Sequence, residues 1–191
     1  TSPALCDRAT IRHNLTEFKV RWCAHIEPWK KETGRPQNQA MTNVLGDLLD
    51  CFRINARDIY LYQRSAKRAS TGRTGKIDLF MPGKVIGEAK SLGVSLDTAH
   101  DQALDYLLGG TIPNSQLLPY VLCSNFETIR ITRQTGYVGD VAGWDITFDL
   151  DEIDEHVEQL AFFPDCKSSN VELVKKIVRL QICLHGSGGL L

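Results

Sequence analysis

The chain has 191 residues, of which 42% are hydrophobic and 24% are charged, and these ordinary globular values predict one α/β domain with a piece of a second. A formal net charge of −1 excludes a general polyanion binder, so contact with nucleic acid would require a local cluster of basic residues. No apolar run approaches the roughly 18–20 residues of a membrane span and no secretory signal opens the chain, so no membrane partner is expected.

Two helices, a strand and a loop are expected in the first part of the chain. Apolar residues at steps of three and four predict an amphipathic helix over residues 10–29, which the polar segment 32–39 breaks. A second helix is expected to end near Arg53, and residues 58–63 are typical of a strand. The basic segment 64–76 has no periodicity, which predicts a mobile loop. The apolar positions of the two helices are Ile11, Leu15, Phe18, Trp22, Ile26, Val44, Leu45, Leu48, Leu49 and Phe52.

The rest of the chain alternates strands with helices. Ser95 is a suitable N-cap for a helix that Gly109 and Gly110 end. Strands are expected at 76–80, 84–90, 118–124, 128–132 and 144–150, and C-terminal helices at 151–163 and 171–184. Because helices both precede and interrupt the strands, this order favours a mixed sheet that is covered on both faces.

Six cysteines, at positions 6, 23, 51, 123, 166 and 183, are widely separated and include no C-x-x-C pair. Four of them (Cys23, Cys51, Cys123 and Cys183) lie inside apolar periodic runs. Buried free thiols are therefore expected, rather than disulfides or a zinc or iron–sulfur site. Free thiols favour a reducing, cytoplasmic setting.

Two carboxylates and a lysine stand on the adjacent predicted strands 76–80 and 84–90. A strand alternates its faces, so Glu88 and Lys90 project together. If Asp78 reaches the same face, the two carboxylates converge, and like charges at that range require a cation. Oxygen ligands from Asp78, Glu88 and the Ala89 carbonyl suit Mg²⁺ or Mn²⁺. Lys90 would then orient or deprotonate an attacking water or neutralise a pentacoordinate phosphate.

The hairpin register tests this arrangement. A strict two-residue loop at Pro82-Gly83 pairs Asp78 with Gly87 and turns it away from Glu88, whereas a three-residue loop over 81–83 or a bulge pairs Asp78 with Ile86. We predict the second arrangement, with both carboxylates on one face. The alternative is that these charges face solvent on an edge hairpin, where lysine also prevents aggregation.

Gln102 and Tyr106 stand at i and i+4 on the helix that follows the motif strand. Facing a metal site, they can hold the nucleophilic water and a phosphate oxygen. The alternative is that Tyr106 packs in the core beside Ala99 and Ala103, while Gln102 is merely solvated.

Together these motifs resemble the PD-(D/E)xK nuclease superfamily, in its RecB-like branch with a Q-x-x-x-Y helix. The run GKIDLFMPGKVIGEAKSLGVSLDTAHDQALDYL looks closely like the amino-terminal endonuclease domain of MmeI-type fused restriction–modification enzymes, and the likeness extends over about residues 11–124. The resemblance implies a three-layer α/β/α restriction-endonuclease-like fold with a central mixed sheet. It also implies metal ligation by Asp78 and Glu88, a catalytic Lys90, and a supporting helix with Gln102 and Tyr106.

The superfamily's leading proline is replaced by Ile77. The superfamily often adds an acid from the first core helix, for which Asp47 and Glu17 are both placed, although surface solvation is the simpler interpretation of each.

The resemblance further implies regions that this sequence does not contain. MmeI-type proteins continue through a helical spacer into an S-adenosylmethionine-dependent adenine methyltransferase and a target-recognition domain, but no glycine-rich methyl-donor motif or Asn-Pro-Pro-Tyr is present here. We therefore expect a fragment with a nuclease domain over 1–150, followed over 151–191 by a linker and the start of the spacer. S-adenosylmethionine is expected only on the missing region.

The expected activity is Mg²⁺-dependent hydrolysis of double-stranded DNA, with Mn²⁺ as a substitute. One site per chain cuts one strand, so cleavage of a duplex would need a second copy in trans. The alternative is a catalytically silent nuclease fold that serves as a DNA-binding or docking module of a methyltransferase. Five basic residues are candidate phosphate contacts, with a solvated loop as the alternative: Arg64, Lys67, Arg68, Arg73 and Lys76.

Overall fold

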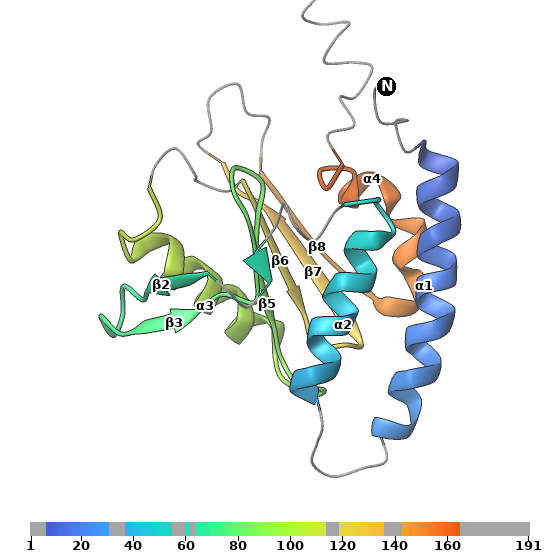
Figure 1. The fold of residues 1–191 in the computed structure, drawn as a ribbon, viewed down its shortest axis with the longest axis horizontal. Coiled ribbons are helices and arrows are strands. Elements are labelled where there is room, and N and C mark those ends of the chain that lie inside the picture. The colour runs from blue at the N-terminus through green and yellow to red at the C-terminus, as the bar shows by residue number, and fades with distance from the viewer. Residues whose placement is uncertain are drawn as a thin grey trace, which may run out of the picture.

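A six-stranded mixed sheet forms the centre of the computed structural model, which describes residues 7–30, 37–54, 60–61, 64–113, 119–135 and 143–164 (Figure 1). The strand order is β1-β4-β5-β6-β7-β8; β5 and β6 are parallel, and all other neighbours are antiparallel. The strands are β1 (Tyr60–Leu61), β4 (Leu79–Met81), β5 (Val85–Ala89), β6 (Tyr120–Ser124), β7 (Thr128–Arg133) and β8 (Trp144–Asp149).

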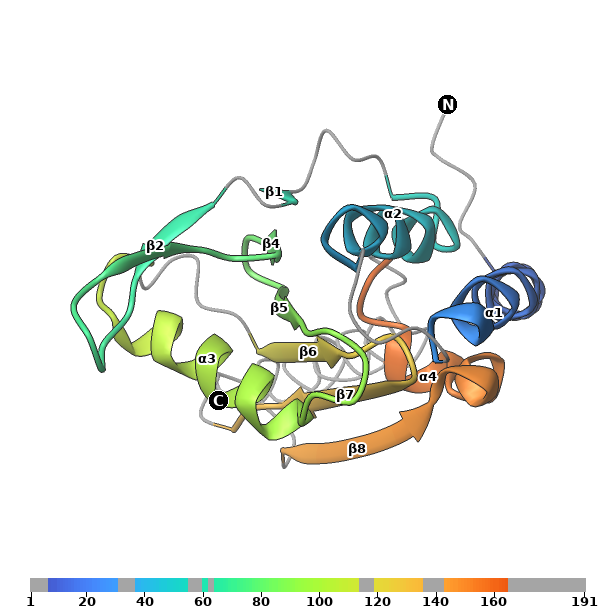
Figure 2. The ribbon, with the colours of Figure 1, turned by 90° about the horizontal axis from the view of Figure 1, so that it is seen from below.

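Helices cover both faces of this sheet, as the sequence predicted. Helices α1 (Arg8–Trp29) and α2 (Gln37–Asp50) lie on one face, and α3 (Leu96–Leu108) lies on the other (Figures 1 and 2). Two hydrophobic clusters fill the two interfaces, one with the apolar residues of α1 and α2 and the other with Ala99, Ala103 and Tyr106 of α3. The fold is therefore the three-layer α/β/α arrangement of the restriction-endonuclease type.

Local capping explains where two of these helices begin. The Asp7 side chain accepts a hydrogen bond from the Thr10 backbone N–H at 2.8 Å, and Ser95 Oγ accepts one from the Asp97 N–H at 3.1 Å. Helix α2 begins at Gln37, inside the segment 32–39 that we expected to be non-helical. Pro36 stands directly before that residue, and proline at a helix start costs no hydrogen bond.

The basic segment 64–76 is a hairpin and not the expected loop. Strands β2 (Ser65–Lys67) and β3 (Thr74–Lys76) pair antiparallel as a separate two-stranded sheet, with Ala66 opposite Gly75. Strands of three residues are too short to show an alternating pattern, and buried Ala66 packs in the same cluster as α3. Tertiary contact therefore decides the structure of this segment.

The hairpin of β4 and β5 confirms the predicted face but corrects the predicted pairing. Leu79 pairs with Gly87 and Phe80 with Ile86, and the turn consists of residues 82–84. One step further along this register, Asp78 stands opposite Glu88, not opposite Ile86. Gly83 has a φ of 72°, which favours glycine and lets the turn close. Both carboxylates thus point to the face that α3 covers.

Beyond β8 the described chain contains two short helical segments. The expected helix over 151–163 consists of a 3₁₀ helix, η3 (Leu150–Glu155), and a short helix, α4 (Val157–Leu160), beside α1 (Figure 2). Ile153, Val157, Leu160 and Phe163 belong to the same hydrophobic cluster as α1. The helix expected at 171–184 lies outside the described residues.

Among the described cysteines, Cys51 and Cys123 are buried free thiols and Cys23 is partly buried. Burial raises the pKa of the Cys51 and Cys123 thiols to about 12, so both remain protonated. The described residues include no helix that is long and apolar enough to span a membrane.

Candidate active site

The candidate site lies where β5 ends beneath α3. Asp78 directly precedes β4, Glu88 lies in β5, and Lys90 follows the last residue of β5. The Lys90 backbone N–H donates to the Ser124 carbonyl at 2.8 Å, which fixes this end of β5 against β6. Because β5 lies between β4 and β6, the alternative of solvent-facing charges on an edge hairpin is wrong for Glu88.

Glu88 is a buried carboxylate with one free oxygen. Its residue is 2% exposed, and its Oε2 accepts a hydrogen bond from Gln102 Nε2 at 2.7 Å, while Oε1 is buried without a hydrogen-bond partner. Burial, and then the charge of Asp78, raise the pKa of Glu88 to about 8, although Lys90 and Arg68 oppose the shift. A buried, unpaired carboxylate oxygen is costly unless a proton or a cation satisfies it.

Asp78 completes a carboxylate pair. Its Oδ2 accepts a hydrogen bond from the Ala89 backbone N–H at 2.8 Å, which ties the residue before β4 to the end of β5. Burial raises the pKa of Asp78, against the lowering effects of that hydrogen bond and of Lys90. In an extended strand the N–H and C=O of one residue point to the same edge, so the Ala89 carbonyl faces the side on which Asp78 lies.

Gln102 joins the lysine to the buried glutamate. Lys90 Nζ donates to Gln102 Oε1 at 2.7 Å, and Gln102 in turn donates to Glu88, so one amide orients both groups. Lys90 Nζ also lies 3.8 Å from Glu88 Oε2. The alternative that Gln102 is merely solvated is therefore wrong.

Tyr106 lies one helical turn beyond Gln102 and is buried. Its hydroxyl donates to the Lys76 carbonyl at 3.3 Å, and its ring packs beside Ala99 and Ala103, as the core alternative predicted. Burial, and then the Glu88 carboxylate, raise the pKa of its hydroxyl. The hydroxyl is thus engaged by the β2–β3 hairpin.

The five candidate phosphate contacts fall into two groups. Lys67, Arg73 and Lys76 are exposed on the hairpin. Arg64 and Arg68 are partly buried: the guanidinium of Arg64 lies over the Phe80 ring and that of Arg68 over the Tyr106 ring, at 5.1 and 5.5 Å from the ring centroids.

The two candidate additional acids lie on the other face of the sheet. Asp47 Oδ2 accepts from Trp22 Nε1 at 3.0 Å and pairs with Arg21 at 3.2 Å, so it joins α2 to α1. Glu17 pairs with His13 at 3.4 Å on exposed α1 surface. The structure brings neither of them to Asp78 and Glu88.

The donor set at the candidate site consists of two carboxylates and a backbone carbonyl. Within the described part of the chain, no group of three or more His, Cys, Asp or Glu side chains is placed to hold a metal ion. The unpaired Oε1 of Glu88 and the two adjacent carboxylates, with only oxygen donors, nevertheless fit a hard divalent cation such as Mg²⁺, which keeps several waters of its own.

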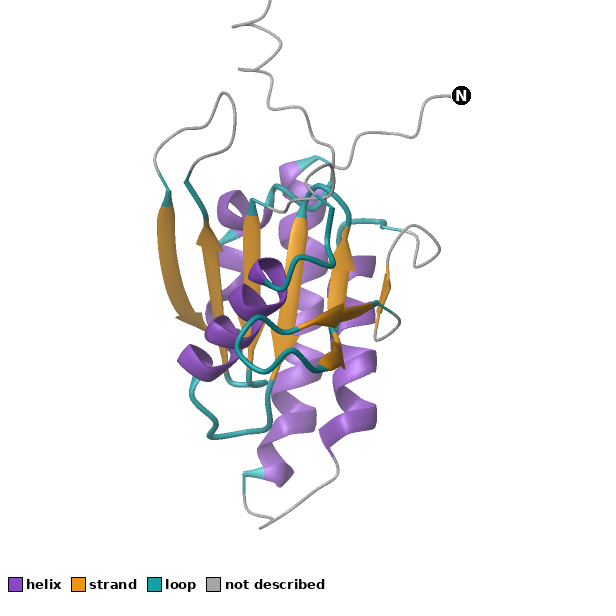
Figure 3. Cartoon of the chain, turned by 90° about the vertical axis from the view of Figure 1, so that its left-hand side faces the viewer, coloured by secondary structure: helices purple, strands orange, loops and turns teal. Residues whose placement is uncertain are grey.

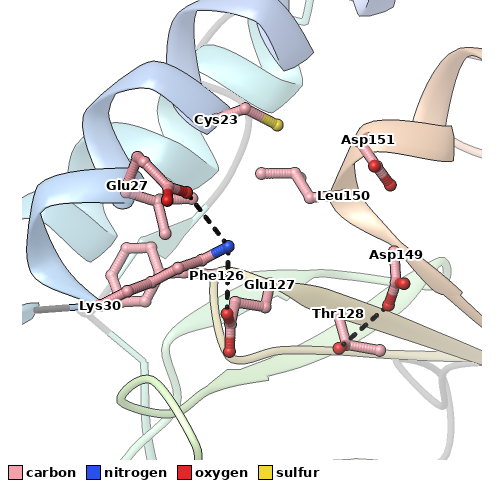
Figure 4. Close-up of a pocket in the computed structure, with 10 residues that line it drawn as sticks. Cys23, Glu27, Lys30, Phe126, Glu127, Thr128, Asp149, Leu150 and Asp151 are labelled. Carbon is pink, nitrogen blue, oxygen red and sulfur yellow. Dashed lines mark hydrogen bonds and ion pairs between the residues drawn. The ribbon is translucent and has the colours of Figure 1, made fainter.

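A cavity of about 470 Å³ lies elsewhere, among α1, the β6–β7 turn and η3 (Figure 4). At its edge Lys30 bridges Glu27 and Glu127, at 3.3 and 3.4 Å, while Asp149 and Asp151 line the wall. Four carboxylates against one ammonium do not suit a polyanion. A second cavity, of about 580 Å³, holds Arg130, which two carboxylates already neutralise.

Sequence reasoning missed Asp105 and Gly75, which both contact the elements around the site. Asp105 accepts hydrogen bonds from Ser70 in the β2–β3 turn, and Gly75 of β3 packs on the Tyr106 hydroxyl. No sequence signal identifies them, because their partners lie about 30 residues or more away along the chain.

A comparison with protein families gives one match: the family model for the N-terminal domain of MmeI matches residues 13–173. No curated protein and no solved structure matches the chain.

Proposed function

Because the chain belongs to the MmeI N-terminal domain family, and thus to a region of a restriction–modification enzyme that acts on DNA, we propose that it is a Mg²⁺-dependent DNA endonuclease domain. The observation that carries this proposal is the buried Glu88, whose free oxygen lies in a centre shared with Asp78 and, through Gln102, with Lys90. A sheet that only had to fold would gain nothing from burying such a carboxylate.

In this proposal Asp78, Glu88 and the Ala89 carbonyl hold Mg²⁺, for which Mn²⁺ substitutes. The bound cation would polarise the scissile phosphate and offset its developing charge. Lys90 orients or deprotonates the attacking water, or neutralises the pentacoordinate phosphate. Gln102 holds Lys90 against Glu88, and Tyr106 supports the centre from the same helix.

The proposed substrate is double-stranded DNA, with phosphate contacts from Arg64, Lys67, Arg68, Arg73 and Lys76. Sequence recognition and S-adenosylmethionine binding would belong to methyltransferase and target-recognition regions of the same polypeptide. One centre of this kind cuts one strand, so a second copy acting in trans would complete a double-strand break.

Plasmid nicking with Mg²⁺ tests the activity. We expect the protein to nick supercoiled DNA, and Lys90→Ala and Asp78→Ala to lower the rate by about 10²–10³-fold, the usual effect of removing one charge-stabilising group. The matched control, Glu155→Ala, removes an exposed carboxylate of η3 and keeps the rate. Equal nicking by all four proteins would remove the catalytic assignment, and no nicking by any would favour the silent docking module.

Metal binding can be measured in the absence of DNA, through its effect on thermal unfolding. We expect Mn²⁺ to raise the thermal unfolding midpoint of the protein by several degrees, through binding to the folded state alone. Asp78→Ala should lose this shift and Glu155→Ala should keep it. A wild-type protein without any shift would argue against the metal site.

A further inference from the structure

The β2–β3 hairpin is attached to the helix that carries Gln102 (Figures 1 and 2). Both carboxylate oxygens of Asp105 accept hydrogen bonds from Ser70, one from the backbone N–H at 2.7 Å and one from Oγ at 2.6 Å. The Ala69 N–H donates to the Asp105 carbonyl at 3.0 Å, and the Lys67 N–H donates to Thr111 Oγ1 at 3.1 Å. The hairpin is thus bonded to α3 and to the residues just after it.

Two glycines let the backbones approach this closely. A Cβ on Gly75 would lie 2.2 Å from the Tyr106 hydroxyl, and a Cβ on Gly109 would lie 1.6 Å from the Lys67 carbonyl oxygen. Neither distance is compatible with a side chain, so any larger residue would push the hairpin away from the helix. The hairpin and α3 therefore form one packed unit.

The two faces of the hairpin differ in chemistry. Ala66 and Gly75 pair on the face that packs on α3, whereas Ser65 pairs with Lys76, and Lys67 with Thr74, on the exposed face. Figure 3 shows the strands of the central sheet with helices in front of and behind them. In the part of the chain that the structure describes, Lys67 and Lys76 have no carboxylate partner. Hydroxyl and ammonium groups on a two-stranded ribbon suit the phosphates of duplex DNA.

Arg68 belongs to the attachment and not to the exposed face. Its Nε lies 3.5 Å from Asp105 Oδ2 and its guanidinium lies over the Tyr106 ring. Asp105 follows Gln102 by three residues on α3, and Gln102 contacts both Lys90 and Glu88. The hairpin that bears the exposed lysines is therefore bonded to Asp105, on the same helix as Gln102, which contacts the candidate centre.

We propose that Asp105 is a positioning residue. Its hydrogen bonds with Ser70 and Ala69, here called the latch, hold the β2–β3 hairpin on α3, so that duplex DNA bound by Lys67 and Lys76 is aligned with the Glu88 centre. This inference rests on the proposed nuclease function. Of the five basic residues, Lys67 and Lys76 bind phosphate from the exposed face, whereas Arg68, instead of contacting phosphate, helps to hold the hairpin through Asp105. Asp105 affects the reaction only through the placement of the substrate.

Latch variants should separate turnover from affinity. We expect Asp105→Ala to lower kcat for nicking by about 10–100-fold, the effect of a displacement of about 1 Å, while KM for DNA changes less than about twofold. Asp105→Asn should restore most of the rate, since its amide can still accept from the Ser70 N–H and donate to Ser70 Oγ. Ser70→Ala, which removes one hydroxyl, should give an intermediate loss if Asp105→Ala fails to fold.

Variants of the exposed face should change the affinity for DNA. The double variant Lys67→Ala, Lys76→Ala should weaken DNA binding in EDTA and flatten the dependence of log affinity on log salt by about 2, the contribution of two phosphate contacts. Arg12→Ala, which removes an exposed cation from α1 on the far side of the sheet, is the matched control and should change neither quantity.

Hydrogen exchange measures the coupling between the hairpin and α3 without requiring DNA cleavage. DNA bound in EDTA should slow amide exchange over both 65–76 and 99–108 in the wild type, but only over 65–76 in Asp105→Ala. Wild-type turnover by folded Asp105→Ala and Ser70→Ala, or equal protection of α3 in wild type and Asp105→Ala, would overturn the latch. A wild type that shows this coupled protection yet never nicks DNA would retain the latch and refute the nuclease function.

Discussion

At the scale of single residues, the centre depends on one buried carboxylate. The residue Glu88 is 2% exposed, and the two charges that oppose its protonation, Lys90 and Arg68, do not offset burial and the Asp78 charge. With a pKa of about 8, the metal-free side chain is mainly protonated at neutral pH. In the proposed function a divalent cation takes the place of that proton, so metal binding should release protons.

The raised pKa of Glu88 predicts how stability depends on pH. In the unfolded chain this group ionises near its ordinary value of 4.5, whereas in the folded protein it ionises near 8. The folded state therefore binds more protons between these values, and the free energy of unfolding falls as the pH rises from 4.5 to 8. We expect Glu88→Gln to flatten this fall in the metal-free protein.

Thermal unfolding in EDTA at several pH values measures this effect. At pH 8, Glu88→Gln should raise the unfolding midpoint by at least about 3 °C, the shift that about 1 kcal/mol gives in a chain of this size. Glu155→Gln, an exposed carboxylate, should keep the wild-type slope. Identical slopes in all three proteins would contradict the assigned burial of Glu88.

The amide of Gln102 should matter for turnover more than for folding. Gln102→Ala leaves Lys90 without its acceptor and Glu88 without its donor, so we expect nicking to fall by about tenfold or more at unchanged KM. Asp101→Ala, an exposed neighbour on the same helix, is the control and should keep the rate. A normal rate for Gln102→Ala would show that Lys90 needs no orienting partner.

At the scale of elements, close backbone approach decides where the β2–β3 hairpin sits. Gly109, just after α3, touches the Lys67 carbonyl, whereas Gly46 inside α2 has no neighbour within 4 Å of an added Cβ. Neither glycine has a positive φ, so the backbone conformation at both positions allows an alanine. Only the packing distinguishes the two sites.

Alanine at these two glycines should therefore have opposite effects on stability. We expect Gly109→Ala to lower the free energy of unfolding by about 1–3 kcal/mol, because the hairpin must move. Gly46→Ala should raise it by about 0.5–1 kcal/mol, because alanine is the better helix former. Urea unfolding measures both, and a stabilised Gly109→Ala would show that the hairpin does not rest on α3.

At the scale of the whole molecule, the segment after the sheet completes the core on the α1 side. Asp154 of η3 accepts hydrogen bonds from Lys19 Nζ at 2.7 Å and Thr16 Oγ1 at 2.9 Å, and Arg8 pairs with Glu158. Ile153 is fully buried in the same cluster as the apolar residues of α1. The domain boundary that we predicted at residue 150 thus falls before residues that pack with α1.

Truncation of Ile153 tests whether this segment folds together with the rest of the domain. We expect Ile153→Ala to lower the free energy of unfolding by about 2–5 kcal/mol in a single cooperative transition. Val20→Ala, which truncates an exposed residue of α1, should stay within about 0.5 kcal/mol. An unchanged main transition for Ile153→Ala would instead support an independent spacer that begins at residue 151.

The sequence by itself determined the elements whose signals are local. Apolar periodicity fixed α1, and the Ser95 cap with its following glycines fixed α3, because a helix of three or more turns repeats its pattern many times. The sequence also led us to predict a three-residue loop or a bulge in the hairpin, and the observed turn of three residues places both carboxylates on one face.

Only the tertiary structure decided the rest. The β2–β3 hairpin is too short for a pattern and exists against α3; the pairing of Asp78 with Glu88 depends on where the turn closes. The burial of Glu88 and the bridge through Gln102 arise from residues that meet across the α3 interface. Desolvation and packing belong to neighbours in space, and a linear sequence does not specify which neighbours those are.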